Sequence, residues 1–190
     1  MVGKFRDDME SPIASVIRSH FPTPVGQLAV FTRGDALLAM EFSDQGKSEQ
    51  ELERHWPGIS ITPGTMPPAI SHALKAYFAD ACCRAFDKLD LRPCGSPFQQ
   101  LVWAKLRSIP PGKTISYGML AQLSGRPGSA RAVGSANGRN PIPIIIPCHR
   151  VIGANGTLTG YGSGLERKAW LLRHEGVSPA SVGQLELGVV

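Results

Sequence analysis

Residues 140–151, Asn-Pro-Ile-Pro-Ile-Ile-Ile-Pro-Cys-His-Arg-Val, constrain the fold of this chain more than any other stretch. The three β-branched isoleucines at 144–146 lie between prolines and predict a short buried strand. Pro147 ends that strand because it has no amide hydrogen to give to a sheet. Cys148 and His149 follow directly. Adjacent residues of a regular strand point to opposite faces, so these two side chains can cooperate only if the backbone turns here.

A plainer interpretation of Cys148 stays open on the dipeptide alone. A single cysteine at the end of a strand is most often a small buried apolar side chain. The other cysteines, Cys82, Cys83 and Cys94, lack the paired spacing of a zinc site or a disulfide framework. We interpret them as free thiols without an assigned role, and we expect no metal site.

The composition is typical of a globular protein. A length of 190 residues allows one large domain or two small ones, and 42% of the residues are hydrophobic. No apolar run reaches the length of a membrane span. Residues 1–11 are acidic and have no apolar core, so they do not resemble a signal or transit peptide. We expect a cytoplasmic protein, associated with the nucleoid when bound to DNA, and no membrane partner.

The charge is divided unevenly along the chain. Residues 1–95 contain 10 Lys or Arg and 12 Asp or Glu, a net charge of −2, whereas residues 96–190 contain 10 and 3, a net charge of +7. The basic half also carries Cys148 and His149. A positive field confined to that half favours a polyanionic partner such as nucleic acid. Ordinary solvated surface charge is the alternative.

The first half predicts a small α/β domain, residues 1–92, that supports the second. Turn residues separate three strands, and helix signals follow. A Ser-x-x-Glu start at Ser48 predicts a capping box. The expected strands cover residues 15–20, 28–32 and 36–42, and the expected helices cover 48–56 and 67–80.

The second half, residues 93–190, predicts a mainly α-helical domain. Ser96 and Pro97 have the residue types of an N-cap and a first helical position. Two short helices joined by a Gly/Pro turn have the outline of a helix-turn-helix. The expected helices cover residues 97–109, 117–123, 127–137 and 165–175. The core face of the first includes Phe98, Leu101, Val102, Leu106 and Ile109.

The helix expected at 127–137 is built almost entirely from small residues, with Arg131 as its only long side chain. A helix that reads base edges in the major groove needs several long polar side chains. Small residues instead allow the backbone to approach the walls of a minor groove closely, with Arg131 inserted. Tight packing against another helix is an equally good explanation of the small residues by themselves.

In its motifs the chain resembles the O6-alkylguanine-DNA alkyltransferases, the methylated-DNA-protein-cysteine methyltransferases. The resemblance covers residues 96–176 closely and the first 90 residues more weakly. Its motifs include Pro97-Phe98-Gln99, Val102-Trp103, Ser116-Tyr117, Arg131-Ala132-Val133-Gly134, Ala136-Asn137-Gly138, Asn140-Pro141, Pro147-Cys148-His149-Arg150-Val151 and Leu158-Thr159-Gly160-Tyr161. For the N-terminal domain the resemblance implies a ribonuclease-H-like fold.

The resemblance implies a role for several residues. Cys148 would accept the alkyl group, activated by His149 through a bound water and by Glu175. Asn140 would tie the DNA-binding helices to the active-site strand. Tyr117 would crowd the target phosphate and donate to the purine. The implied DNA contacts are Tyr117, Gly118, Arg126, Arg131, Ala136 and Asn137, and the implied lining of the base pocket is Val151 and Tyr161.

The implied activity is direct repair of double-stranded DNA containing O6-alkylguanine, and less so O4-alkylthymine, by a monomer that binds the minor groove and needs no cofactor. The chain departs from the family pattern at Gly162-Ser163-Gly164, where the family usually has Ser or Ala, Gly, Gly. Two other functions are open at this stage. A lesion sensor would flip the base without dealkylating it, but such proteins carry tryptophan in place of Cys148. A cysteine hydrolase would leave the basic half unexplained.

Overall fold

The computed structural model describes residues 15–177, so the expectations for the two ends of the chain lie outside the described residues. The described residues form two compact units, one of residues 15–96 with 141–145 and the other of residues 97–140 with 146–177. Within residues 15–177, every helix is too short or too polar to cross a membrane.

A four-stranded sheet forms the centre of the first unit. Its strands are β1 (Ser15–Thr23), β2 (Gly26–Arg33), β3 (Ala36–Phe42) and β4 (Ser60–Pro63), in the order β3-β2-β1-β4. The first three form the antiparallel meander predicted from the turn residues. The sequence did not predict β4, which pairs parallel with β1. Its four residues are largely exposed, so β4 lacks the alternating apolar pattern that identifies a strand.

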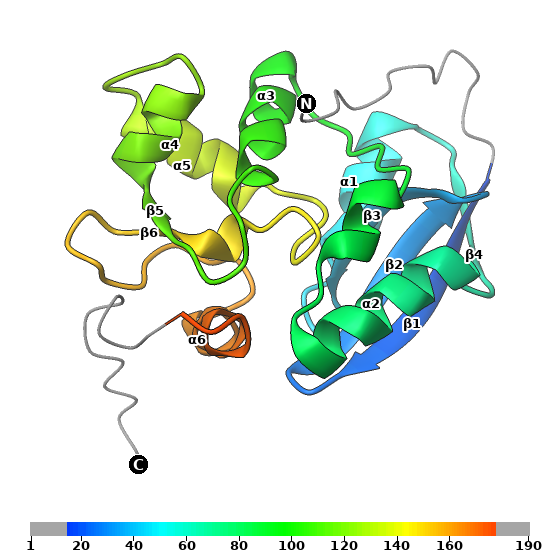
Figure 1. Ribbon diagram of the computed structural model, residues 1–190. Helices are drawn as coiled ribbons and strands as arrows, with labels where there is room; N and C mark the ends of the chain where they lie inside the picture. The colour runs from blue at the N-terminus through cyan, green and yellow to red at the C-terminus, as the bar shows by residue number, and fades with distance from the viewer. Residues whose placement is uncertain (1–14, 178–190) are drawn as a thin grey trace. The chain divides into compact units, whose positions relative to one another are not determined.

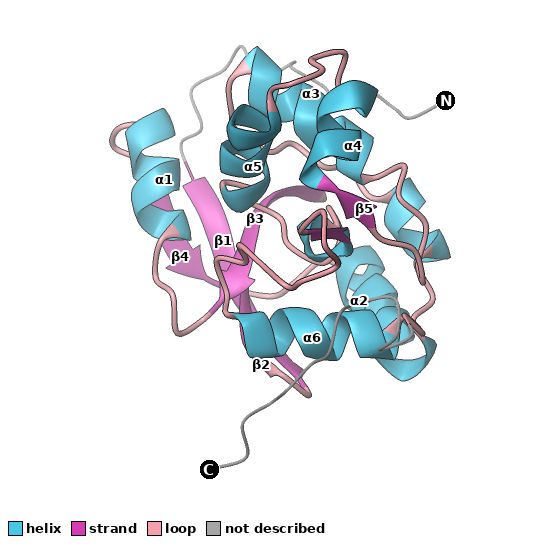
Figure 2. Cartoon of the chain, turned by 90° about the vertical axis from the view of Figure 1, so that its left-hand side faces the viewer, coloured by secondary structure: helices cyan, strands magenta, loops and turns pink. Residues whose placement is uncertain are grey.

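Two helices cover opposite faces of this sheet (Figures 1 and 2). Helix α1 (Ser48–His55) contributes Leu52 to a core cluster with Val16 and Phe31. Helix α2 (Pro68–Asp80) stacks Phe78 on Phe21. Val16 and Phe21 are an odd number of positions apart on one strand, so they point to opposite faces. A 3₁₀ helix, η1 (Arg84–Lys88), follows α2.

The start of α1 is stabilised differently from the prediction. The Ser48 side chain makes no capping hydrogen bond, so the predicted capping box is wrong. The carboxylate of Glu41 on β3 instead accepts the backbone N–H groups of Lys47 and Ser48, at 2.9 and 3.0 Å. A carboxylate from a neighbouring strand therefore satisfies free amide groups at the helix start, where the helix dipole also favours negative charge.

The second unit packs helices around a two-stranded parallel sheet. Its elements are α3 (Pro97–Leu106), β5 (Ile115–Ser116), α4 (Tyr117–Leu123), α5 (Ala130–Gly138), η2 (Cys148–Arg150), β6 (Val151–Ile152) and α6 (Leu165–His174). The buried indole of Trp103 on α3 donates to the Ala136 carbonyl of α5 at 2.8 Å. Strand β5, directly before α4, pairs with β6, directly after η2. The short sheet therefore fixes the start of α4 beside the Cys148 turn.

In the second unit, three helices have bounds that differ from the predictions. Helix α3 ends at Leu106, three residues before Ile109, and Leu101 is 40% exposed and not part of its core face. Helix α5 begins at Ala130, after a turn in which Gly128 has a φ of 82°. Helix α6 ends at His174, with Glu175 as its C-cap and Gly176 at a φ of 77°. The predicted bounds of α4 are confirmed.

Residues 144–146 are buried as predicted, but they form a turn and no strand. Ile144 has a φ of 73°, and the Ile145 amide donates to the Pro143 carbonyl at 2.9 Å, the features of a γ-turn with positive φ. A second such bond runs from the Cys148 amide to the Ile146 carbonyl, across Pro147. Three prolines remove the amide hydrogens a sheet would need, so the chain folds back on itself in local turns.

Candidate active site

The turn after Pro147 brings Cys148, His149 and Arg150 into the interior of the second unit. All three residues of η2 are buried, with exposed fractions of 5%, 0% and 4%. A 3₁₀ turn does not alternate its side chains between two faces as a strand does, so adjacent residues can serve one site. The predicted turn at this position is therefore present, although the strand before it is not.

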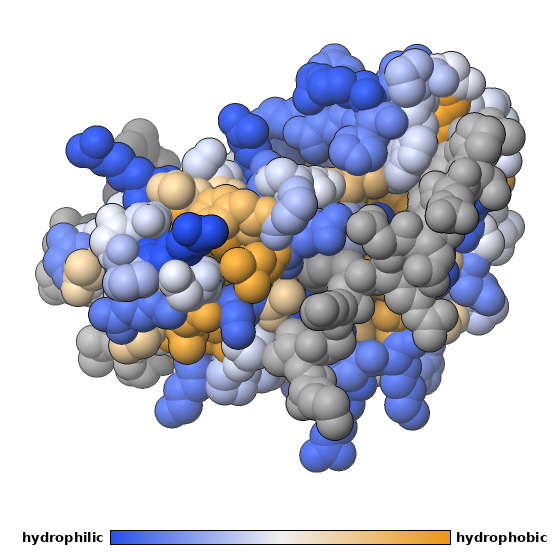
Figure 3. Space-filling model, turned by 90° about the horizontal axis from the view of Figure 1, so that it is seen from above, coloured by the Kyte–Doolittle hydropathy of each residue, from blue (hydrophilic) through white to orange (hydrophobic). Residues whose placement is uncertain are grey.

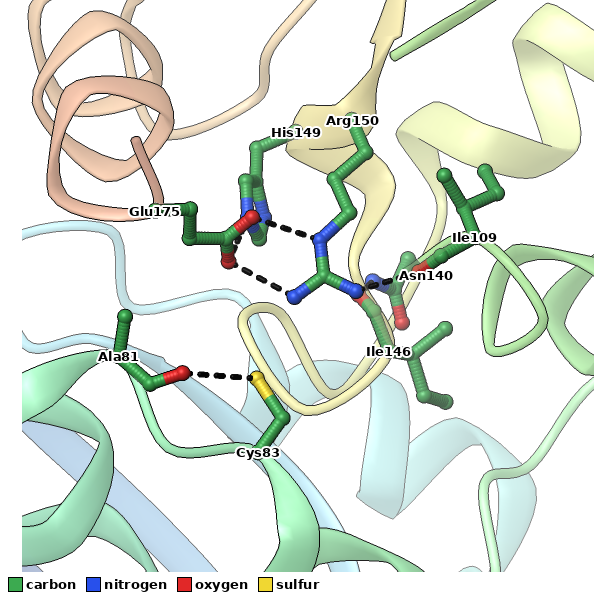
Figure 4. A network of polar contacts seen from close by, with 8 residues as sticks. All are labelled: Ala81, Cys83, Ile109, Asn140, Ile146, His149, Arg150 and Glu175. Atoms are coloured by element: carbon green, nitrogen blue, oxygen red, sulfur yellow. Dashed lines mark hydrogen bonds and ion pairs between the residues drawn. The ribbon is translucent and has the colours of Figure 1, made fainter. Parts of the chain in front are cut away.

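The Glu175 carboxylate contacts both His149 and Arg150 (Figure 4). Its Oε1 accepts a hydrogen bond from His149 Nε2 at 2.8 Å, and both carboxylate oxygens bond the Arg150 guanidinium, at 2.7 and 2.8 Å. The same guanidinium also donates to the Ile109 carbonyl. These bonds join the C-cap of α6 to η2. Glu175 thus reaches His149 across 26 positions of sequence.

The bond to Glu175 fixes the protonation of both partners. Burial raises the pKa of Glu175, but the hydrogen bonds and positive charges of His149 and Arg150 outweigh it and bring the pKa to about 2. Because the carboxylate can only accept, His149 carries its hydrogen on Nε2. Burial lowers the pKa of His149, and Glu175 only partly opposes it. The imidazole is therefore neutral, with Nδ1 as an acceptor that has no hydrogen-bond partner among the described residues.

The Cys148 thiol is surrounded by groups that favour its ionised form. Burial raises the pKa of Cys148. A hydrogen bond from the Asn140 side chain, the positive charge of Lys168 and nearby backbone amides act in the opposite direction. Asn140 also donates to the Ile146 carbonyl at 2.7 Å, which fixes its amide beside the turn. The thiol is neutral at rest, and Asn140, Lys168 and the backbone amides help a thiolate to form.

A glycine-rich loop, residues 153–164, contains Tyr161 and is hydrogen-bonded to Tyr117. The Tyr117 hydroxyl, on the first residue of α4, donates to the carbonyls of Thr159 and Gly160, at 3.3 and 3.4 Å. Burial raises the pKa of both tyrosines, and a negative charge on Cys148 raises it further. Both therefore keep their protons at neutral pH. Val151, the first residue of β6, is fully buried.

The predicted DNA-contacting residues do not all reach the surface. Gly118, Arg126 and Arg131 are exposed. Ala136 and Asn137 are only 3% and 2% exposed, and their role as DNA contacts stays a prediction. Both lie on the inner side of α5, where Ala136 accepts from Trp103 and Asn137 donates to the Cys148 carbonyl at 3.4 Å. Tight helix packing, left open from the sequence, explains these two small residues.

The exposed part of α3 and α4 is partly apolar. Leu101, Met119 and Leu123 are 40 to 47% exposed. Figure 3, drawn from the end at which α3 and α4 lie in Figure 1, shows apolar surface among hydrophilic side chains. The second unit thus exposes apolar side chains of α3 and α4 as well as the basic side chains of Arg126 and Arg131.

Two buried cations of the site were not predicted from the sequence. Arg150 holds Glu175, and Lys168 on α6 donates to the carbonyls of Val151 and Thr159. Arg150 directly follows Cys148 and His149 in the sequence, but that position alone does not indicate a bond to Glu175. The helical spacing of Lys168, Leu171 and Leu172 places all three on one face of α6, and this spacing could have indicated that Lys168 is buried.

Comparisons with known proteins agree with this geometry. Residues 97–177 match the family described as 6-O-methylguanine DNA methyltransferase, DNA binding domain. The methylated-DNA–protein-cysteine methyltransferase of Salmonella typhimurium is 47% identical over 165 residues, 85% of this chain and 96% of that protein. That of Mycobacterium bovis is 46% identical over 153 residues, 80% and 88% of the two chains.

Solved structures give the same result. The crystal structure of the Mycobacterium tuberculosis O6-methylguanine methyltransferase is 42% identical, with a TM-score of 0.70 over 87% of this chain and 96% of that one. The OGT of the same organism in complex with DNA is 39% identical, with a TM-score of 0.72 over 88% and 98%. A buried thiol supported by a His-Glu pair defines the site as one for cysteine chemistry. The chain belongs to the methylated-DNA–protein-cysteine methyltransferase family.

Proposed function

We propose that this protein repairs double-stranded DNA directly, by transferring the alkyl group of O6-alkylguanine, and less so of O4-alkylthymine, to Cys148 Sγ. The observation that carries this proposal is the buried hydrogen bond from His149, the residue directly after Cys148, to Glu175. These residues lie in the half of the sequence, residues 96–190, that has a net charge of +7. The membership of the chain in a DNA-repair family supports it. The protein acts as a monomer and needs no metal or cofactor for the transfer.

The DNA-binding part of the proposal rests on α4 and α5. We interpret these helices as a helix-turn-helix whose second member docks in the minor groove, with Arg126 and Arg131 toward the phosphates and the base stack. Both arginines are exposed, and the small residues of α5 allow close approach. In the first unit, the strand order β3-β2-β1-β4 supports a ribonuclease-H-like assignment.

Extrusion of the damaged nucleotide is necessary in this scheme. A base inside the duplex cannot present its exocyclic oxygen to a buried sulfur, and flipping it out costs about a few kcal/mol. Arg131 fills the space that the base leaves. Tyr117 contacts the target phosphate and the purine, and Val151 and Tyr161 line the base pocket. The hydroxyl of Tyr117 is already held by the Thr159 and Gly160 carbonyls beside that pocket.

The proton of Cys148 leaves through His149. The neutral imidazole has its acceptor, Nδ1, buried and without a hydrogen-bond partner among residues 15–177, a position suited to a water that bridges to the thiol. Glu175 accepts from Nε2 and stabilises the imidazolium that forms when Nδ1 takes the proton. Asn140 and Lys168 stabilise the sulfur charge at the same moment.

The transfer itself exchanges one bond for another. The Cys148 sulfur forms a bond to the alkyl carbon, the carbon–oxygen bond breaks, and its electron pair stays on guanine. Guanine then takes up one proton, so the products are unmodified guanine and an S-alkyl cysteine. A thioether has no carbonyl for water to attack, and each protein molecule therefore reacts once.

The departure at Gly162-Ser163-Gly164 affects the edge of the proposed base pocket. Gly162 is exposed, and a Cβ built there would meet only the Gly138 carbonyl, at 3.8 Å. The chain thus has space at position 162 but no side chain to bond the lesion oxygen. We infer that this space admits alkyl groups larger than methyl.

The test of this function is the fate of O6-methylguanine in a duplex. We expect one O6-methylguanine to become guanine per protein molecule, as measured by nucleoside analysis of the digested DNA. Cys148→Ser removes the nucleophile and leaves the lesion in place. Continued loss of lesions beyond one per protein, or equal loss with Cys148→Ser, would overturn the proposal.

The same assay tests Arg131. Arg131→Ala slows repair of the duplex by about tenfold or more, because the extruded base loses the group that replaces it. Its reaction with free O6-benzylguanine, which needs no extrusion, stays at the rate of the unsubstituted protein. Equal losses on both substrates would contradict this role.

A further inference from the structure

Asn137 is the only polar residue among the buried residues of α5. Its exposed fraction is 2%, and the other buried residues of the helix are Val133 and Ala136. The Asn137 side chain donates from Nδ2 to the Cys148 carbonyl at 3.4 Å. Tight packing explains why the residues of α5 are small, but an apolar side chain would pack as well without burying an amide. The amide at position 137 therefore calls for a separate explanation.

The Cys148 carbonyl does not depend on Asn137 for a hydrogen bond. It also accepts the backbone amide of Val151, at the end of the η2 turn. The bond from Asn137 is long for an N–H···O hydrogen bond, so we expect it to orient the amide more than it stabilises the carbonyl. Because a carbonyl can only accept, Nδ2 faces Cys148, and the amide oxygen Oδ1 remains to accept from another group.

Two buried acceptors near Cys148 have no hydrogen-bond partner among residues 15–177. They are Oδ1 of Asn137 and Nδ1 of His149. The first belongs to the side chain that is bonded to the Cys148 carbonyl, and the second belongs to the next residue in the chain. Buried acceptors without a donor destabilise a fold, so two of them at one residue indicate a donor that serves both. A single water molecule has the two hydrogens that this requires.

We propose that Asn137 is a positioning residue for alkyl transfer: its Oδ1 is the second acceptor of the water that carries the thiol proton to His149. This inference rests on the proposed function. The water donates one hydrogen to Asn137 Oδ1 and the other to His149 Nδ1, which leaves its oxygen to accept from the thiol. In the transfer, Cys148 gives its proton to the water and the water gives one to Nδ1, so the water is regenerated while sulfur bonds the alkyl carbon.

Two fixed acceptors orient the water better than one. A water that is held only by Nδ1 rotates about that bond, and its oxygen then faces the sulfur for part of the time. The imidazole is fixed by the bond from Nε2 to Glu175, at 2.8 Å, and Asn137 is fixed by its position on α5. A second amide, that of Asn140, donates to the Ile146 carbonyl at 2.7 Å and holds the other side of the turn.

The test measures alkyl transfer from free O6-benzylguanine between pH 6 and 9.5, with the rate constant followed by intact mass. Asn137→Leu replaces the amide by an apolar side chain of similar size, and Asn137→Ala removes it without adding bulk. Each is made in the unsubstituted protein and together with His149→Gln, which removes the base. The free base reacts without DNA, so the predicted contact of Asn137 with DNA does not affect the result.

We expect both Asn137 variants to react about tenfold more slowly than the unsubstituted protein at pH 7, because the water is no longer held in one orientation. The deficit shrinks toward pH 9.5, where hydroxide forms the thiolate without His149. The ratio of the two rates at each pH is compared, since the ionisable groups around Cys148 are the same in both proteins. They are His149 and Arg150 of η2, Lys168 of α6, Glu175 at its end, Tyr117 of α4 and Tyr161 of the glycine-rich loop.

In the His149→Gln protein, the same Asn137 substitutions are expected to change the rate by less than about twofold. Two residues that act through one water have effects that do not add, because the first substitution already removes the relay. Ser135→Ala, at an exposed position of the same helix, is the matched control and leaves the profile unchanged.

Three results would overturn the inference. The first is a deficit that is equal at every pH, and the second is a further tenfold loss in the His149→Gln protein, since a purely structural asparagine would give both. The third is a folded Asn137 variant that reacts at the unsubstituted rate at pH 7. Thermal unfolding identifies a variant that fails to fold, and the other Asn137 variant then decides. Absence of alkyl uptake by the unsubstituted protein would instead count against the proposed function.

Discussion

Glu175 keeps a full negative charge in a place from which water is excluded. Its side chain is 0% exposed, and the penalty of burial is met by three hydrogen bonds from His149 and Arg150. A buried ion pair adds little to folding stability compared with apolar residues of similar volume. Removing one partner, however, is strongly destabilising because it leaves the other charge buried and unpaired. We therefore expect Glu175 to orient His149, and we expect its substitution to be strongly destabilising.

The Glu175 charge predicts how stability depends on pH. The folded pKa of about 2 is below the ordinary 4.5, so the contribution is fully present above about pH 4.5 and is lost as pH falls toward 2. Glu175→Gln lowers the free energy of unfolding at pH 7 by on the order of 3 kcal/mol. Urea unfolding at pH 7 and at pH 3 measures both values.

The difference between Glu175→Gln and the unsubstituted protein is expected to shrink between those two pH values. Glu166→Gln, which removes an exposed carboxylate from the first turn of the same helix, is the control with little effect at either pH. A difference that stays constant from pH 7 to pH 3 would show that Glu175 does not carry the charge assigned to it.

At the scale of elements, the glycine-rich loop is held by its close approach to Tyr117. Gly160 has a φ of 56°, and a Cβ at that position would lie 2.9 Å from the Tyr117 hydroxyl. A left-handed conformation and a contact this short both require glycine. The loop and α4 therefore keep their spacing only while residue 160 has no side chain.

Gly160→Ala is expected to slow alkyl transfer by about tenfold or more, because the Tyr117 hydroxyl must move and the loop must leave its left-handed conformation. Gly162→Ala is the matched control in the same loop. Its Cβ has ordinary contact distances, so its rate is expected to stay within about twofold of the unsubstituted protein. Single-turnover rates on a methylated duplex measure both, and equal rates for the two variants would contradict the role of Gly160.

Local signals predicted the elements that depend on local chemistry. The bounds of α4 follow from Ser116, whose hydroxyl accepts the Met119 amide, and from Gly125 after the helix. The meander strands follow from their turns. The β-branched residues 144–146 predict a strand, but the three prolines around them lack the amide hydrogens that a sheet needs, so the prediction of a strand is wrong.

Contacts between residues far apart in the sequence cannot be predicted from local signals of this kind. The Arg150–Glu175 and Lys168–Thr159 bonds depend on where α6 packs, and no periodicity in the sequence encodes that position. The burial of Ala136 and Asn137 depends on the close contact of α3 with α5. Family motifs drew attention to Cys148, His149 and Glu175, but they did not reveal the cations beside them.

At the scale of the whole molecule, charge and chemistry lie in the same part of the chain. The residues from 96 onward carry the net charge of +7, the reactive turn and both exposed arginines of the proposed DNA surface. Electrostatic attraction to phosphates does not depend on sequence, which suits a protein that must find one damaged base among many normal ones. The first unit contributes a sheet covered by helices, and none of the proposed site residues lies in it.

The most direct measurement is the mass of the peptide that contains Cys148 after the protein has been mixed with a duplex bearing one O6-methylguanine. We predict that this peptide gains the mass of one methylene group, in proportion to the guanine restored. The peptides containing Cys82, Cys83 and Cys94 are expected to remain unchanged. Loss of the methyl group from DNA without a gain on Cys148, or a gain on another cysteine, would contradict the assignment of Cys148 as the acceptor.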